Sequence, residues 1–226
     1  MVPDAYPHDP VPVGSGSGPG LFSESARVEI FSDGVIAIAI TLLVLDLKVP
    51  EGEPGSVAHR LLEQWPAYLA YLASFIYLGV VWVNHHALFT RIGKVDNGVL
   101  WRNLAMLLAL SVLPFPTATL AYAMQHGTYG DQLTALALYG LIVSAMGLTW
   151  LLMFFYLDQR RELLSEGVAP GFFREERRRA ALGILSPVVA VAIGVVAPVV
   201  ALFVFLLIPI FYGLTTEGWT PPRRQA

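Results

Sequence analysis

The chain has 226 residues, of which 55% are hydrophobic and 14% are charged, and its mean hydropathy is +0.60. Soluble globular proteins carry about 25% charged residues, so this composition indicates an integral membrane protein. The net charge of −3 gives no reason to expect a nucleic-acid partner. The absence of cysteine excludes disulfides, thiolate metal sites and cysteine nucleophiles.

The N-terminal segment is rich in Pro, Gly and Ser (MVPDAYPHDPVPVGSGSGPG). It lacks the positive region and apolar core of a cleaved signal peptide, and its composition is typical of a flexible segment. We therefore expect a flexible cytoplasmic tail over residues 1–26, a transmembrane domain over 27–216 and a cytoplasmic C-terminal tail over 217–226.

Apolar segments of about 20 residues, the length that crosses a bilayer core, follow one another along the chain. Residues 181–214 form one uncharged run, which as a single helix would be about 50 Å long, well beyond a core of about 30 Å. We expect this run to be two spans joined near Pro198. Four spans precede it: residues 28–47, 66–89, 98–124 (with Pro114 and Pro116 as kink sites) and 133–157. The sequence therefore predicts an all-α integral membrane protein with six transmembrane helices.

The distribution of basic residues predicts the orientation. With the N-terminus inside, the cytoplasmic segments hold 12 of the 14 Lys and Arg residues, and only Lys48 and Arg60 fall outside. The positive-inside rule then places both termini in the cytoplasm. The basic stretch 160–180 is interpreted as a solvated cytoplasmic connector, which could include a short surface helix, with binding of anionic lipid headgroups as the alternative.

The first apolar segment opens with charged and hydroxyl side chains (RVEIFSD, residues 27–33). At 100° per residue, Ser32 and Asp33 point about 120° and 140° away from Ile38, on opposite sides of the helix. A second face centres on Ile38. It is apolar apart from one hydroxyl and comprises Gly34, Ile38, Thr41, Leu42 and Leu45. The polar residues should therefore meet other helices of the bundle, while the Ile38 face could meet its own copy across a symmetry axis.

The string Arg27-x3-Phe31-Ser32-Asp33-Gly34-Val35, followed by AIAITLLVLDL, resembles the bacterial members of the transmembrane protein 175 family, which are potassium channels. The similarity continues through WVNHHALF (82–89) and DNGVLWRNLAMLLALSVLPFPTATL (96–120). Later segments match only in hydrophobicity and number. Arg102, inside the third segment, is not part of this pattern, and its role is left open.

The resemblance implies a six-helix subunit that assembles as a homotetramer, with the first helices lining a central pore and no TVGYG filter. By position, Ile38 would form the constriction, Thr41 would supply hydroxyls beside it and Leu45 would form a further apolar ring. Without the family, a face turned to lipid or to the protein core would be the simpler interpretation. Ser32 and Asp33 would form a structural hydrogen-bond node, with Arg27, Asn84, His85 or Asn103 as candidate partners. Arg27 and Phe31 are included because they belong to the same family motif.

The sequence therefore predicts a potassium-permeable, potassium-preferring cation channel in the plasma membrane of a bacterium, with potassium ions, identical subunits and membrane lipid as partners. No cofactor is expected, and no metal beyond transient potassium in the pore. His85 and His86 diverge by about 100°, so both cannot readily bind one ion.

The alternative is an ion-coupled secondary transporter of a small cation. Such proteins place ionisable groups near the membrane midplane, and the predicted spans after Arg102 contain none. The sequence shows neither a nucleophile with a base nor a set of metal ligands, so an enzyme is not expected.

Overall fold

The computed structural model describes residues 24–49, 53–169 and 171–215, and in these ranges every regular element is helical. The predicted tails, 1–26 and 217–226, fall mainly outside the described residues, although α1 already begins at Glu24. The elements are α1 (Glu24–Leu43), η1 (Val44–Asp46), α2 (Val57–Glu63), α3 (Trp65–Phe89), α4 (Asn97–Val112), α5 (Pro114–His126), α6 (Tyr129–Gln159), η2 (Arg161–Leu163), α7 (Phe172–Gly194) and α8 (Pro198–Thr215).

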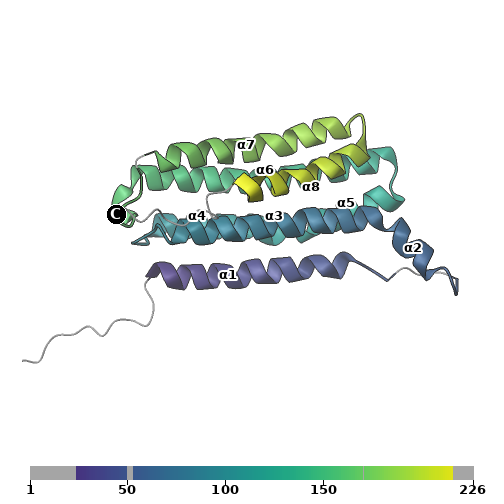
Figure 1. Ribbon diagram of the computed structural model, residues 1–226, viewed down its shortest axis with the longest axis horizontal. Coiled ribbons are helices and arrows are strands. Elements are labelled where there is room, and N and C mark those ends of the chain that lie inside the picture. Colours follow the sequence, from purple (N-terminus) through teal and green to yellow (C-terminus); the bar gives the residue numbers. More distant parts are fainter. Residues whose placement is uncertain (1–23, 50–52, 170, 216–226) are drawn as a thin grey trace, which may run out of the picture.

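The long helices lie side by side as a bundle (Figure 1). Helix α1 forms one edge, where it packs against α3, α4 and α5, and α7 forms the opposite edge, where it packs against α6 and α8. Between these edges α3 contacts α5 and α8, and α6 contacts α4 and α5. Because α1 has neighbours on one side only, much of its surface is not covered by the rest of the chain.

The predicted kink in the third segment is a break between two helices. Helix α4 ends at Val112, and α5 begins at Pro114. Pro114 and Pro116 lack the N–H groups that would otherwise bond to the carbonyls one turn earlier, so the helical ladder cannot run through this point. The predicted junction near Pro198 is also found, because α7 ends at Gly194 and α8 begins at Pro198.

Five helical segments of the described chain are long and apolar enough to cross a membrane: 24–46, 65–89, 97–126, 129–159 and 198–215. Helix α7 is not among them, because its first two turns carry Arg174, Glu175, Glu176 and three further arginines. Its apolar part is confined to 180–194, although the whole helix runs alongside α6 (Figure 1). Counting α4 and α5 as one, six long helical segments form the bundle of a multi-pass membrane protein.

Most of the basic side chains of the described residues lie at one end of the bundle. The loop after α3 and the loop after α6 meet there, since the N–H of Gly93 donates to the carbonyl of Leu163 at 2.9 Å and the N–H of Ser165 donates to that of Arg91 at 2.9 Å. The start of α1 lies at the same end, toward which α8 also runs (Figure 1). Both basic loops therefore lie at one end of the bundle.

Candidate functional site

Helix α1 has one face buried in the bundle and one face left open. The buried residues are Ser32, Ile36, Ala39 and Leu43, which are 0–2% exposed and face α3, α4 and α5. On the other side Ile38 is 62% exposed and Leu45 is 69% exposed, and Thr41 between them is exposed as well. The open face therefore carries the three residues that the sequence placed there, in a chain whose remaining helices do not cover them.

The Thr41 hydroxyl has a defined orientation on this open face. Its Oγ1 donates to the carbonyl of Ile38 at 2.8 Å. Because a hydroxyl has one proton and two lone pairs, this bond commits the proton to the backbone and leaves the oxygen as an acceptor. The Thr41 oxygen can thus interact favourably with a cation that approaches the open face.

A buried chain of hydrogen bonds fastens α1 to α3 and α4. The Ser32 Oγ donates to the carbonyl of Val28 at 2.9 Å, the Asn103 Nδ2 donates to the Ser32 Oγ at 2.9 Å, and the Asn103 Oδ1 lies 3.1 Å from the His85 Nε2. Since an amide oxygen only accepts, the Nε2 of His85 carries the proton in this bond. Ser32, His85 and Asn103 are at most 2% exposed, so this chain is a polar contact inside an apolar bundle.

A second set of polar contacts lies at the more exposed side of the same helix pair. The indole N–H of Trp82 donates to the Asp33 Oδ1 at 3.0 Å, and the Glu29 Oε1 lies 2.6 Å from the His86 Nδ1. Glu29 and Asp33 are four residues apart on α1, and Trp82 and His86 are four residues apart on α3. Because the two helices run antiparallel, matched four-residue spacings bring both pairs into register.

The structure separates the residues that the sequence grouped around Ser32 and Asp33. It brings Ser32, His85 and Asn103 together and gives Asp33 the partner Trp82, which the sequence had not indicated. Arg27 and Phe31 are exposed and are not among the hydrogen-bond partners of either residue. Asn84 lies on another side of α3, where it lines a cavity beside α7. The four-residue spacing on both helices is the signal that would have pointed to Trp82.

Arg102, whose role the sequence left open, braces the start of α4 against α6. Its guanidinium lies 3.9 Å from the centre of the Tyr156 ring, a cation–π contact. The Tyr156 hydroxyl donates to the Asp96 Oδ2 at 2.5 Å, while the Asp96 Oδ1 caps α4 by accepting from the N–H of Val99 at 2.9 Å. A Cβ on Gly98 would overlap the Tyr156 hydroxyl, so this close approach requires glycine.

Ionisation of Asp96 is favoured by this arrangement. Partial burial raises the pKa of the carboxyl. The hydrogen bonds from the Tyr156 hydroxyl and the Val99 N–H, together with the charge of Arg160, outweigh that effect and hold the pKa below its usual value. Among the described residues, no cluster of three or more His, Asp or Glu side chains is suited to holding a metal ion.

These features define a class: a multi-pass helical membrane protein in which one apolar, hydroxyl-bearing helix face is left open at the edge of the bundle. Comparison with known proteins identifies the family. A sequence model described as "Endosomal/lysosomal potassium channel TMEM175" matches residues 27–114. A potassium channel of Streptomyces collinus is 39% identical over 192 residues, which cover 84% of this chain and 92% of that relative. The chain therefore belongs to the TMEM175 family.

A solved structure and an animal relative agree with this assignment. The crystal structure of a lysosomal potassium-selective channel TMEM175 homolog from Chamaesiphon minutus superposes with a TM-score of 0.74 at 32% sequence identity, covering 85% of this chain and 98% of that one. An endosomal/lysosomal proton channel TMEM175 of Gallus gallus is 42% identical over 97 residues, which are 39% of this chain and 19% of that relative.

Proposed function

We propose that this protein is a potassium-permeable, potassium-preferring cation channel that assembles as a homotetramer with α1 of each subunit lining a central pore. The open face of α1 is the observation that carries the proposal, because it leaves most of Ile38 and Leu45 uncovered in the single chain. Two relatives whose names or titles call them potassium channels support the choice of ion. The basic end of the bundle supports an orientation with both termini cytoplasmic, and the relatives from Streptomyces collinus and Chamaesiphon minutus support a location in a bacterial plasma membrane.

In the proposed pore, the choice of ion depends on the diameter of the side-chain rings and on the free-energy cost of removing water from the ion. Ile38, Thr41 and Leu45 lie on one face, so each becomes a ring of four side chains in a fourfold assembly. The Ile38 ring is bulky and β-branched, and it narrows the path and can close it by excluding water. The acceptor oxygens of the Thr41 ring, one turn away, would replace part of an ion's hydration shell. Partial dehydration costs less free energy for K⁺ than for Na⁺, and this difference accounts for the preference for K⁺.

The alternative, an ion-coupled secondary transporter, predicts ionisable groups near the midplane. In α6 the acidic residues are Asp131 and Asp158, which lie at its two ends. In α7 the charges are confined to the first turns, and α8 has none in its described length. The described helices after α5 thus offer no charged site within the membrane core for a coupled ion.

Ion flux from liposomes tests the proposal. Purified protein should release K⁺ down its gradient without a coupling ion and faster than Na⁺. Ile38→Ala should raise the conductance of single channels, because the constriction widens. Thr41→Val keeps the side-chain shape but removes the oxygen, so it should change the K⁺ to Na⁺ ratio more than the conductance. Leu141→Ala is the matched control, since Leu141 is 64% exposed but lies on α6.

Two results would contradict the proposal. K⁺ movement that requires a second ion on the opposite side would place the protein among transporters. Unchanged current and ion preference in both Ile38→Ala and Thr41→Val would show that ions follow a path away from α1.

A further inference from the structure

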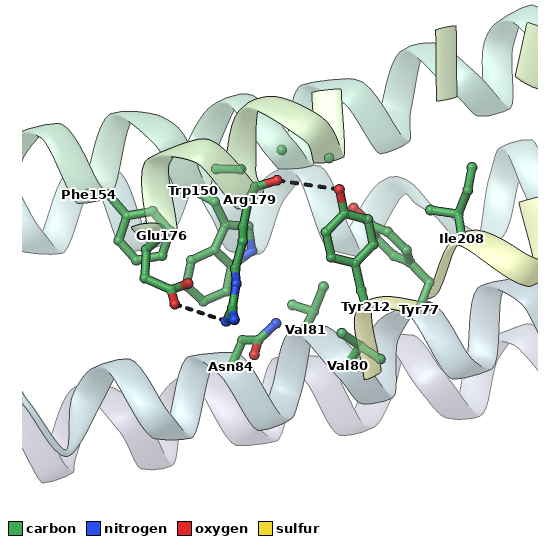
Figure 2. A pocket seen from close by; sticks show the side chains of 13 residues that line it. Tyr77, Val80, Val81, Asn84, Trp150, Phe154, Glu176, Arg179, Ile208 and Tyr212 are labelled. Atoms are coloured by element: carbon green, nitrogen blue, oxygen red, sulfur yellow. Dashed lines mark hydrogen bonds and ion pairs between the residues drawn. The ribbon is translucent and has the colours of Figure 1, made fainter. Parts of the chain in front are cut away.

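A cavity opens between α3, α6, α7 and α8, on the far side of α3 from the open face of α1 (Figure 2). Its volume is about 80 Å³, and its mouth is open to the surface of the bundle. One part is walled by aromatic and aliphatic side chains, among them Tyr77, Trp150 and Ile208. The other part is polar, and the proposed ion path uses none of it.

The polar part contains more positive than negative charge. Arg179 pairs with Glu176 at 3.2 Å, and Asn84 lies beside this pair (Figure 2). A smaller adjoining cavity shares these three residues and adds Arg91, whose guanidinium stacks over the Phe172 ring at 4.7 Å. Two guanidiniums therefore line the joined cavities beside one carboxylate, with one Arg91 N–H bonded to the carbonyl of Ala87. This excess of positive charge favours an anionic group that can accept hydrogen bonds from Arg.

The cavity also crosses the boundary between the polar and the apolar part of the bundle. Arg179 is the last charged residue of α7, and the apolar stretch 180–194 follows it directly. The opposite part of the cavity reaches Tyr77 and Ile208, which lie inside the apolar helices α3 and α8. The charged and apolar parts of the cavity thus follow each other along the bundle in the same order as headgroups and acyl chains follow each other in a bilayer.

A glycine keeps the apolar part open. A Cβ added to Gly183 would meet only the Tyr212 hydroxyl, at 3.9 Å, so the space beside this position is unoccupied. Gly147, which also lines the cavity, is different, because a Cβ there would press on Ile184 at 3.0 Å. A Cβ at position 183 therefore enters the cavity without pressing on α6, so a larger side chain there extends into the space of the cavity.

We propose that this cavity binds an anionic phospholipid, with part of one acyl chain in the apolar part and the phosphate held by Arg179 and Arg91. A phospholipid matches the site in both respects, since it presents a negative phosphate and an apolar chain separated along the membrane normal. The Asn84 amide adds a neutral donor at the headgroup level. The site is independent of the proposed pore, because none of its residues lies on α1.

Native mass spectrometry of the full-length protein in mild detergent tests this proposal. Phosphatidylglycerol and phosphatidylcholine are titrated in parallel, and inorganic phosphate is added in a third series. Arg179→Gln and Gly183→Leu are compared with Arg178→Gln, because Arg178 is 77% exposed and does not line the cavity. The melting temperature of each variant is measured in the absence of added lipid, so that a folding defect is distinguished from a binding defect.

The wild type should retain phosphatidylglycerol in preference to phosphatidylcholine. Arg179→Gln should weaken the binding of phosphatidylglycerol about tenfold, which is the effect of losing one charged hydrogen bond. Gly183→Leu should weaken the binding of both lipids equally, because the leucine side chain occupies the space of the acyl chain. Arg178→Gln should change neither. Equal retention of the two lipids, an equal loss in Arg178→Gln, or a Gly183→Leu variant that melts normally and binds normally would overturn the proposal. Binding of inorganic phosphate with the affinity of the lipid would show a soluble anion site instead.

Discussion

The buried hydrogen-bond chain depends on Asn103. Of the three side chains in it, Asn103 alone both donates one hydrogen bond to another helix and accepts one from another helix. It donates to Ser32 and accepts from His85. A hydrogen bond between membrane helices contributes about 0.6 kcal/mol on average, whereas a buried polar group left without its partner costs about 1–3 kcal/mol. Removing Asn103 should therefore cost more than the two bonds contribute.

We expect Asn103→Leu to lower the free energy of unfolding by about 1–3 kcal/mol, because the side chain keeps its volume while the buried His85 N–H loses its acceptor. Thermal or SDS-induced unfolding in detergent measures the change. Leu104→Ala is the control at a neighbouring position that is 43% exposed. A loss in Leu104→Ala as large as that in Asn103→Leu would contradict the role given to the buried chain.

Asp33 should act on stability through Trp82. Asp33→Ala and Trp82→Phe each remove one side of the same bond, so the double variant should be less destabilised than the sum of the two single variants, by about 0.6 kcal/mol. A double-mutant cycle in detergent measures this coupling. Strict additivity would mean that the contact contributes nothing. A changed ion preference with unchanged stability in Asp33→Ala would assign Asp33 to conduction.

The sequence predicted the direction of these side chains but not all of their neighbours. A helical wheel places Ser32 and Ile38 on different faces of α1 whatever surrounds the helix, and the burial of Ser32 and exposure of Ile38 agree with it. The partner of a polar side chain depends on how far one helix is shifted along the next. That shift is not visible in one helix alone, which is why Asn84 was grouped with Ser32 and Trp82 was overlooked.

At the scale of elements, the helix ends were the least predictable feature. The break before Pro114 and the start of α8 at Pro198 follow from the missing proline N–H. Helix α7 begins earlier than its apolar run, at Phe172, because arginines and glutamates are good helix formers and ion pairs such as Arg179–Glu176 stabilise its first turns. Hydropathy alone assigned those turns to the connector.

The contact between α4 and α6 should depend on pH through Asp96. Its pKa is held below the usual value in the folded protein, and the unfolded value is about 3.9. The stabilisation is therefore fully present above about pH 4 and is lost as the pH falls through the lower, folded pKa. At pH 7 we expect Asp96→Ala to cost about 1 kcal/mol as a lost helix cap, and Asp96→Asn to cost less.

Thermal unfolding of these variants at several pH values measures the effect. The difference between the wild type and Asp96→Ala should stay constant from pH 7 to about pH 5 and shrink in stronger acid. A difference that grew as the pH fell would mean that the protonated carboxyl is the stabilising form, contrary to the hydrogen bonds that it accepts.

At the scale of the whole molecule, the bundle has two edges with different properties. Helix α1 is held by polar contacts on its inner face and exposes Ile38, Thr41 and Leu45 on the other. At the opposite edge, the charged first turns of α7 lie beside a cavity. The first edge suits contact between subunits around an axis, and the second suits contact with lipid, so the two proposals assign the two edges to different partners.

The absence of cysteine from the chain makes the assembly directly testable. In a tetramer around α1, a cysteine at position 38 or 45 of each subunit faces the central axis, where helix motion can bring it to the Cβ separation of about 4 Å that a disulfide with a neighbouring subunit requires. Mild oxidation of Ile38→Cys or Leu45→Cys in membranes should therefore give a disulfide-linked dimer on a non-reducing gel. Leu141→Cys, at an equally exposed position on α6, should stay monomeric. Native mass spectrometry of the untreated protein should give four times the chain mass of 24.6 kDa. Equal cross-linking at positions 38 and 141 would reflect random collisions, and its absence at both 38 and 45 would place α1 away from the axis.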